Sequence, residues 1–400
     1  MKKLLLFLAL ICLINITNAQ WQQTSLDSTY TVKALAINGS NIFAATNNYG
    51  MYLSSNNGNS WSMVNTGIPT NTNVNTLAIS GSNIFAGTSS CGVYLSSNNG
   101  GLWTAVNTGL PSIFGTYVSL NALAIKGDTV FAGTNNDGVF LSTDNGGNWT
   151  AVNTGLPIGA EVTALAISGE NNFAGIYLQG VYLSTNNGNS WTVVNNGLTS
   201  TTNVSALIIS GGNIFVGTKT AGIFLSTDNG GDWNAVNNGL TNFYVYSFAI
   251  SGGNIFAGTD GGGVFFSSNN GQQWATINTG LTDLVVYALA ISGDTLFAGT
   301  NGGVWKHPLT QMNGIEEMNE NNNIVIYPNP ATNNLTIEAS QKATSDSYRI
   351  EITNIQGQII LQQQLRQGKT DIDISGLAKG IYILKRNSND KTEVKRIVKE

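Results

Sequence analysis

The feature that most constrains this sequence is a unit of 40 to 46 residues that occurs seven times in its 400 residues. Each unit starts with a short apolar run, turns into a second run such as Ile-Phe-Ala-Gly-Thr, and continues with Gly-Val-Tyr-Leu or a close variant. In most units a Trp and a Val-Asn-Thr-Gly segment follow. Four short strands joined by tight turns form an antiparallel meander. Such meanders bury both of their faces when they stack around an axis, so the repeat predicts a β-propeller.

The placement of the Trp residues predicts how the ring of units closes. A fourth-strand Trp follows each of the first six units, at Trp61, Trp103, Trp149, Trp191, Trp233 and Trp274. No such strand follows Trp305 in the seventh unit, whereas a spare copy begins at Trp21, 40 residues before Trp61. We therefore predict an all-β chain with a seven-bladed β-propeller whose last blade is completed by the N-terminal strand. All these Trp residues are expected to be structural.

Charge divides the sequence into two parts. From residue 20 to 308 there are four Lys, no Arg and eleven acidic residues, whereas residues 323–400 contain seven Lys, four Arg and eight acidic residues. The change in composition marks a domain boundary. A first part with so few cations has no basic patch, so we expect no nucleic-acid partner.

The N-terminus has the pattern of a signal peptide. Two lysines precede an apolar run over Leu4–Ile14, and Thr17–Ala19 provides a small-residue cleavage site. A membrane anchor is the alternative, but the apolar run is short for a span. One cysteine, Cys91, remains after cleavage, so no internal disulfide is expected. The predicted organisation is a signal peptide over 1–19, a propeller over 20–308, a linker over 309–322 and a second domain over 323–400.

The turn between the third and fourth strands has the pattern Ser-x-Asp/Asn-x-Gly-x-x-Trp in six units. Its Asp or Asn positions are Asn56, Asn98, Asp144, Asn186, Asp228 and Asn269. An Asp or Asn oxygen can accept backbone N–H groups and close such a turn, Gly permits positive φ, and Trp anchors the returning strand. Four of the six are Asn, which suits a turn better than a calcium site, so no metal or cofactor is predicted.

This pattern resembles the Asp-box, or BNR, repeat of sialidases, xyloglucan-active glycoside hydrolases and non-enzymatic photosystem assembly propellers. The resemblance implies a propeller fold. It also implies that these turns are structural and distant from any active site.

The residues of the first part give weak support for catalysis. Sialidases bind the substrate carboxylate with an arginine cluster, and this propeller has no Arg. Other glycosidases need two carboxylates flanking the scissile bond, about 5 to 9.5 Å apart. Asp137 and Asp260 are the catalytic candidates, but they belong to the third and sixth units. The only histidine, His307, is expected to be a strand-end residue.

A binding role has more support, because the predicted face opposite the Asp-box turns is rich in amides and aromatic rings, which bind sugars or protein loops. The candidates are Asn47, Tyr49, Asn136, Tyr177, Gln179 and Tyr244. We therefore predict a monomeric binding or adhesion module for a glycan or a protein. A glycoside hydrolase of the xyloglucanase-like class is the alternative.

The C-terminal part alternates short apolar strands with polar turns and predicts a small Ig-like β-sandwich. Three of its segments, Tyr327–Pro330, Ile352–Gly357 and Leu377–Tyr382, are followed by a basic end. In this order they resemble the C-terminal sorting domain of type IX secretion. The resemblance implies that this domain contacts the type IX machinery and that the protein is secreted or displayed on the outer membrane of a Gram-negative bacterium. An ordinary accessory sandwich is the alternative.

Overall fold

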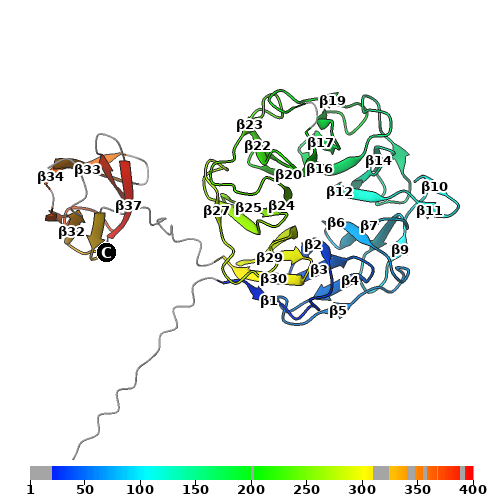
Figure 1. The fold of residues 1–400 in the computed structure, drawn as a ribbon, viewed down its shortest axis with the longest axis horizontal. Coiled ribbons are helices and arrows are strands. Elements are labelled where there is room, and N and C mark those ends of the chain that lie inside the picture. The colour runs from blue at the N-terminus through cyan, green and yellow to red at the C-terminus, as the bar shows by residue number, and fades with distance from the viewer. Residues whose placement is uncertain are drawn as a thin grey trace, which may run out of the picture. The chain divides into compact units, whose positions relative to one another are not determined.

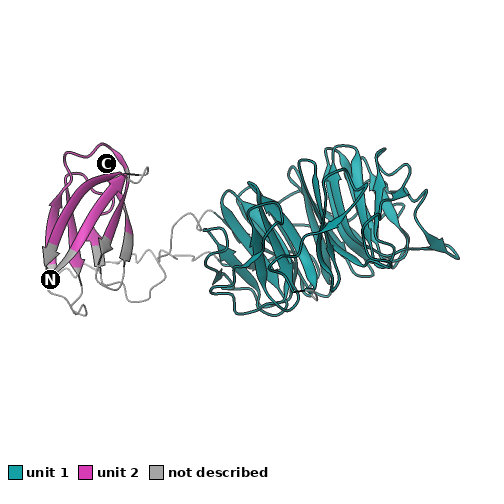
Figure 2. Ribbon diagram, turned by 90° about the horizontal axis from the view of Figure 1, so that it is seen from above, with its two compact units in different colours: residues 1–314 teal, residues 315–400 magenta. Residues whose placement is uncertain are grey.

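The computed structural model describes residues 20–199, 202–309, 324–339, 347–354, 358–366, 368–387 and 392–399. The predicted signal peptide and nearly all of the predicted linker lie outside these residues. The chain divides into two compact units, residues 1–314 and 315–400, which Figure 2 colours separately. All regular elements in the described ranges are β-strands, so the all-β prediction is confirmed. Within the same ranges, no helix has the length and apolar character of a membrane span.

Each repeat contributes strands to one four-stranded antiparallel sheet, and seven such sheets lie within the described part of the first unit. The first strands surround the axis in Figure 1. They are β2 (Val32–Asn38), β6 (Val74–Ser80), β12 (Leu120–Lys126), β16 (Val162–Ser168), β20 (Val204–Ser210), β24 (Val245–Ser251) and β28 (Val286–Ser292). The second strands are the most completely buried, because both of their faces pack against neighbouring sheets. They are β3 (Asn41–Thr46), β7 (Asn83–Thr88), β13 (Thr129–Thr134), β17 (Asn171–Ile176), β21 (Asn213–Thr218), β25 (Asn254–Thr259) and β29 (Thr295–Thr300).

The third and fourth strands lie farther from the axis. The third strands are β4 (Gly50–Ser54), β8 (Val93–Ser96), β14 (Val139–Ser142), β18 (Gly180–Ser184), β22 (Ile223–Ser226), β26 (Val264–Ser267) and β30 (Gly303–Pro308). The fourth strands are β5 (Ser62–Met63), β9 (Thr104–Ala105), β15 (Thr150–Ala151), β19 (Thr192–Val193), β23 (Asn234–Ala235), β27 (Ala275–Thr276) and, for the last sheet, β1 (Gln22–Gln23). A small extra hairpin, β10 (Ser112–Ile113) and β11 (Thr116–Tyr117), lies between the second and third sheets in the chain.

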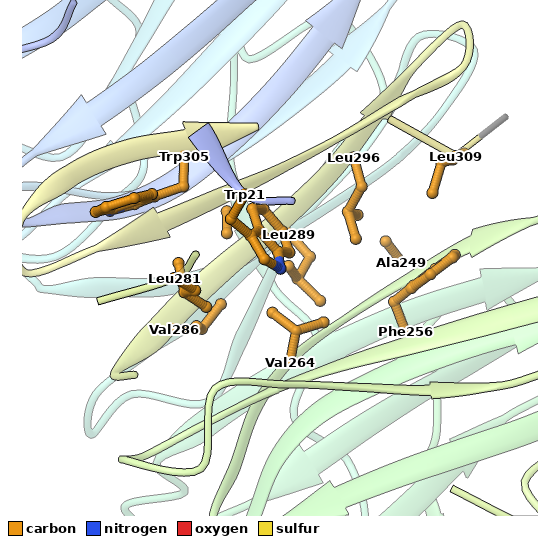
Figure 3. Close-up of a cluster of buried hydrophobic side chains, with 11 residues drawn as sticks. Trp21, Ala249, Phe256, Val264, Leu281, Val286, Leu289, Leu296, Trp305 and Leu309 are labelled. Atoms are coloured by element: carbon orange, nitrogen blue, oxygen red, sulfur yellow. The ribbon is translucent and has the colours of Figure 1, made fainter. Parts of the chain in front are cut away.

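The N-terminal strand completes the last sheet, as predicted. β1 pairs antiparallel with β30, which puts Gln22 opposite Lys306 and Gln23 opposite Trp305. Trp21 is 2% exposed and packs among apolar side chains of the last two sheets, as Figure 3 shows. Because β28 also packs against β2, the sheets form a closed ring.

The turns with the Ser-x-Asp/Asn-x-Gly pattern are closed by side chains. In the third sheet, Ser142 Oγ donates to Asp144 Oδ1 at 2.7 Å and accepts from the Gly146 N–H at 2.8 Å. Asp144 Oδ1 also accepts from the Asn148 N–H at 2.9 Å. The side chain and backbone of Asn148 both donate to this carboxylate, and they lower the pKa of Asp144 to about 2. The other five turns make the same three kinds of bond.

The Trp at the end of each of these turns joins neighbouring sheets. The Trp149 indole N–H donates to the Val106 carbonyl at 2.7 Å, and its backbone N–H donates to the Thr108 carbonyl at 2.8 Å. Trp103, Trp191, Trp233 and Trp274 repeat both bonds to the preceding sheet. These residues therefore anchor blades to one another as well as filling the core.

The fourth strands are shorter than the sequence predicted. We expected them to run from the Trp into Val-Asn-Thr-Gly, but each ladder spans two residues. The Asn of that segment replaces the missing backbone pairing. Asn153 Oδ1 accepts from the Val139 N–H at 2.7 Å, and its amide nitrogen donates to the Asp137 carbonyl at 2.8 Å.

The described part of the C-terminal unit has two sheets. One has the order β31 (Ile324–Tyr327), β32 (Asn334–Ala339), β35 (Gly368–Asp373), and the other has the order β34 (Ile359–Arg366), β33 (Ser347–Asn354), β36 (Gly380–Asn387), β37 (Thr392–Lys399). Residues from both sheets share one core, including Leu335, Ile337, Ile352 and Leu384, each at 0% exposure. The predicted sandwich is confirmed.

Candidate functional site

One position of the repeat surrounds the axis of the ring. It is the second residue of each first strand, and it directly follows a Val or Leu with 0% exposure. In every sheet the register between the first and second strands shifts across this position, so the residue is a β-bulge without a partner in the second strand. A bulge re-aims a side chain, here away from the neighbouring sheets and toward the axis. The seven residues are Lys33, Asn75, Asn121, Thr163, Ser205, Tyr246 and Tyr287.

Three of these axial residues have short side chains that bridge neighbouring sheets. The Asn75 amide donates to the Leu120 carbonyl at 3.1 Å, and Thr163 Oγ1 donates to the Val204 carbonyl at 2.6 Å. Ser205 Oγ donates in the same way to Val245. These bonds close gaps between neighbouring sheets and fix the orientation of the three side chains.

The three long axial side chains lie together, because β24, β28 and β2 are successive strands around the ring. The rings of Tyr246 and Tyr287 have centroids 4.9 Å apart, and Tyr244 lies 4.7 Å from Tyr246. Lys33 Nζ is 3.3 Å from the Tyr287 ring centroid, and Lys219 Nζ is 5.9 Å from that of Tyr244. We call the three rings the tyrosine ladder and the two cations the end lysines.

The tyrosine ladder and the end lysines line one cavity of about 460 Å³, together with Asn75 and Asn121. This volume falls within the range of about 300–1,000 Å³ that small-ligand sites occupy. Lys219 and Tyr244 come from the connections β21–β22 and β23–β24, so the cavity opens on the face opposite the Asp/Asn turns. Its described lining contains no carboxylate.

Burial sets the electrostatics of this cavity. Loss of hydration lowers the pKa of Lys33, and the negative charge of Asp260 partly offsets this effect. Burial also raises the pKa of Tyr246, and its hydrogen bond with Tyr244 adds to the increase. The ion pairs found in the described ranges join Lys126 to Glu170, Arg349 to Glu351 and Lys369 to Glu338, and none of them includes an end lysine.

The structure brings two of the predicted binding residues together. Tyr244 belongs to the ladder, and Tyr177, in the β17–β18 turn, lies 5.8 Å from Lys219 Nζ. Tyr49 instead stacks on Tyr30, with centroids 4.5 Å apart. The other three predicted residues lie in turns of separate sheets and not in the cavity lining. They are Asn47 in β3–β4, Asn136 in β13–β14 and Gln179 in β17–β18.

The two catalytic candidates occupy different environments. Asp137 is exposed in the β13–β14 turn, where its backbone N–H donates to Thr134 Oγ1 at 3.0 Å. Asp260 is half-buried at the end of β25, and its charge acts on Lys33. Neither side chain lines the cavity. His307 is buried on β30 and packs against Trp21, with ring centroids 5.2 Å apart.

A metal centre has no support from the side chains that are described. They contain no group of three or more His, Cys, Asp or Glu that could hold an ion.

Sequence reasoning missed Lys33, Lys219, Tyr246 and Tyr287. A signal was present for three of them. In repeats that otherwise vary little, the position after the buried Val or Leu reads Lys, Asn, Asn, Thr, Ser, Tyr and Tyr. Variation at one fixed position of a repeat indicates a surface that does not form the common core.

Comparisons with known proteins found similarities for both units of the chain. Residues 325–400 match the family model described as a secretion system C-terminal sorting domain. This tail implies export by the type IX system, to the cell surface or the medium, as in Gram-negative bacteria of the Bacteroidetes type. No curated protein matches the chain.

Solved structures with low sequence identity share the propeller fold. YCF48 from Cyanidioschyzon merolae has a TM-score of 0.54 at 13% identity, covering 72% of this chain and 99% of that one. YCF48 bound to D1 peptide has a TM-score of 0.60 at 16% identity, covering 74% and 98%. The GH74 xyloglucanase from Xanthomonas campestris has a TM-score of 0.58 at 16% identity, covering 74% of this chain and 54% of its own. At these identities the likeness shows the fold alone.

Proposed function

We propose that the protein is an exported binding module that holds a glycan in the cavity beside the tyrosine ladder. The observation that carries this proposal is the lining itself: three Tyr rings, two amides and two ammonium groups around about 460 Å³. Aromatic faces cover the apolar face of a sugar ring, while amides and ammonium groups bond its hydroxyls. The predicted residues Tyr177 and Tyr244 belong to the same face.

Hydrolysis has less support from this geometry. A glycosidase needs two carboxylates beside the scissile bond. The described lining has none, and the sequence candidates Asp137 and Asp260 belong to the third and sixth sheets. The xyloglucanase-like alternative therefore requires a substrate that lies outside this cavity.

A surface protein is the second candidate ligand. Exposed apolar residues occur on connections that lead into four different first strands: Phe114, Ile158, Phe243 and Leu284 are all at least 36% exposed. Exposed apolar side chains on one face are typical of protein-binding surfaces. One propeller of similar fold, YCF48, is known in complex with a peptide.

The organisation of the chain forms part of the proposal. We assign the six Ser-x-Asp/Asn-x-Gly-x-x-Trp turns as Asp-box repeats with a structural role, which their hydrogen bonds support. We assign residues 1–19 as a signal peptide, 20–308 as a monomeric propeller, 309–322 as a linker and 323–400 as the sorting domain.

The test is a glycan array with the purified protein, followed by reducing-sugar assays on every polysaccharide that binds. We expect binding without release of soluble sugar, and loss of binding in Tyr246→Ala. Leu102→Ala is the matched control, because Leu102 is 50% exposed in an Asp-box turn on the opposite face. Sugar release that disappears in Asp137→Ala or Asp260→Ala would establish the hydrolase instead.

A further inference from the structure

We propose that the cavity selects glycans that contain uronic acids, with the sugar carboxylates held at the end lysines. This inference rests on the glycan-binding function proposed above and specifies its ligand class. It starts from the distribution of cations. Residues 20–308 contain four lysines and no arginine, and two of the four line one cavity.

The end lysines differ from the other propeller lysines in their partners. Lys126 Nζ lies 3.0 Å from Glu170 Oε1, and Lys306 Nζ donates to Asn59 Oδ1 at 2.8 Å. Among the described residues, Lys33 and Lys219 have aromatic rings as neighbours and no carboxylate within ion-pair distance. Their positive charges are therefore available to an anion that enters the cavity.

Lys33 is the stronger anion site of the two. Its side chain is half-buried, and its ammonium is held over the Tyr287 ring. A partly dehydrated ammonium gains more from a carboxylate partner than a fully hydrated one, because less water has to be displaced. Asp260 acts on Lys33, Tyr246 and Tyr287 through space, but it lies outside the cavity lining.

The walls between the end lysines favour a sugar ring over an extended peptide. The three Tyr rings follow one another at 4.7 and 4.9 Å with interplanar angles of 43° and 51°, which gives a continuous aromatic wall. Asn75 and Asn121 come from β6 and β12, across the ring from β24 in Figure 1. An aromatic wall facing two amides suits a pyranose ring, because its C–H face packs on aromatic rings and its edge carries hydroxyls. A lysine at each end of the wall adds the preference for acid groups.

Isothermal titration with matched sugars tests this inference. The probes are short oligogalacturonates and the same oligosaccharides after reduction of their carboxyl groups, which removes the charge and keeps the ring. We expect the acidic form to bind at least about tenfold more tightly, because its carboxylate makes a charge-assisted bond that the reduced form cannot make. Short oligomers also limit repulsion from the eleven acidic residues of the propeller.

Lysine variants test which of the end lysines binds the sugar carboxylate. Lys33→Met should remove most of the preference for the acidic form and Lys219→Met a smaller part of it, whereas Lys33→Arg, which keeps the charge, should retain more of it than Lys33→Met. Lys126→Met is the control and should leave affinity unchanged, because Lys126 ends β12 on the opposite face. Melting temperatures confirm that each variant is folded.

The outcomes separate this inference from the proposed function. Equal binding of the acidic and reduced sugars overturns the uronate assignment and leaves glycan binding intact. Binding of neither, together with an array without ligands, overturns the glycan function itself. Equally tight binding of poly-glutamate overturns the sugar assignment and favours an acidic protein partner.

Discussion

The backbone N–H of Trp21 donates to the carbonyl oxygen of Thr279 at 2.9 Å. The same bond joins Trp274 to Asn238 and Trp233 to Asn196, between sheets that follow each other directly in the chain. The N-terminal strand therefore enters the ring by the contact that Trp103, Trp149, Trp191, Trp233 and Trp274 make, whereas the Trp61 indole N–H donates to Thr24 Oγ1 at 3.1 Å. Closure needs no special device, because a displaced copy of a repeat strand meets the surface that the repeat provides.

We predict that Trp21→Ala destabilises the propeller by about 3–5 kcal/mol, the usual cost of truncating a buried Trp. The indole is 2% exposed, and its N–H donates to the Ile277 carbonyl at 2.5 Å. Urea denaturation of the full chain, followed by Trp fluorescence, measures the change. Deleting residues 20–31 should cost more and expose the edge of β30 to aggregation.

The control for this prediction is Gln22→Ala, at the next residue, where β1 begins and the side chain is exposed. Substitutions of this kind usually stay within about 0.5 kcal/mol. A Trp21→Ala variant as stable as Gln22→Ala would mean that the N-terminal strand does not close the ring.

A pair of glycines tests the approach between neighbouring sheets. Gly109 has φ +96°, and a Cβ there would lie 2.1 Å from the Trp149 carbonyl oxygen. Gly127 also has positive φ, +61°, but a Cβ there would meet nothing within 4 Å. Gly127→Ala should therefore cost about 1–2 kcal/mol for backbone strain alone. Gly109→Ala should cost at least about 1–3 kcal/mol more, because the sheets have to separate. Equal melting temperatures for the two variants would contradict this.

The pKa of Asp144 predicts a pH dependence of stability. Hydrogen bonds from Asn148 lower this pKa from 3.8 to about 2 in the folded protein. A lowered folded pKa means that the contribution to stability is present above 3.8 and is lost as the pH falls toward about 2. Asp144→Asn keeps the turn, because four of the six turns have Asn at this position. Wild type should therefore lose more melting temperature than the variant between pH 5 and pH 2. Parallel melting curves across that range would be evidence against a lowered pKa.

Much of the fold could be predicted from the sequence because its signals are local and recur. Ser142, Asp144 and Gly146 bond within five residues, so the spacing of the letters carries the geometry of the turn. Closure of the ring could be predicted for the same reason, because Trp21 marks a displaced copy of the fourth strand. The short length of the fourth strands was not predicted. Asn153 replaces backbone pairing with side-chain hydrogen bonds, and the sequence pattern of such a segment does not differ from that of a longer strand.

The candidate site was predicted only in part. Tyr244, which lines the cavity, and Tyr177, which lies near Lys219, were among the sequence candidates because both are aromatic residues in loops. Tyr246 and Tyr287 were not, because they become neighbours only when the successive strands β24 and β28 pack side by side. Lys33 joins them only after closure brings β28 beside β2, from opposite ends of the repeat region. A pattern within one repeat cannot show which long side chains become neighbours around the axis.

Export by the type IX system predicts where a chain that lacks its C-terminal domain will accumulate. In a type IX-competent host, full-length protein should reach the surface or the medium, whereas a chain without residues 323–400 should stay in the periplasm. Fractionation and protease accessibility measure the distribution. A reporter fused to residues 323–400 is the control and should be exported. Normal surface delivery of the truncated chain would show that another segment directs export.

The last prediction is that Lys33 lowers the free energy of unfolding of the propeller, as expected for a residue retained for binding. Burial lowers its pKa, which means that folding removes water from the ammonium and disfavours its charged form. Lys33→Met keeps the length of the side chain and removes that cost, although it also gives up a contact with Tyr287 worth about 0.5–1 kcal/mol. We expect a variant at least as stable as wild type at pH 7.

The same lowered pKa predicts a pH dependence. Because the unfolded chain binds the Lys33 proton more tightly than the folded one, wild-type stability should rise relative to the variant as pH increases through the lowered pKa toward 10.5. Urea denaturation of both proteins at pH 7 and pH 10 measures this difference. A variant that is clearly less stable at pH 7, or a difference that does not change with pH, would show that Lys33 is a structural residue and would weaken its assignment as a ligand cation.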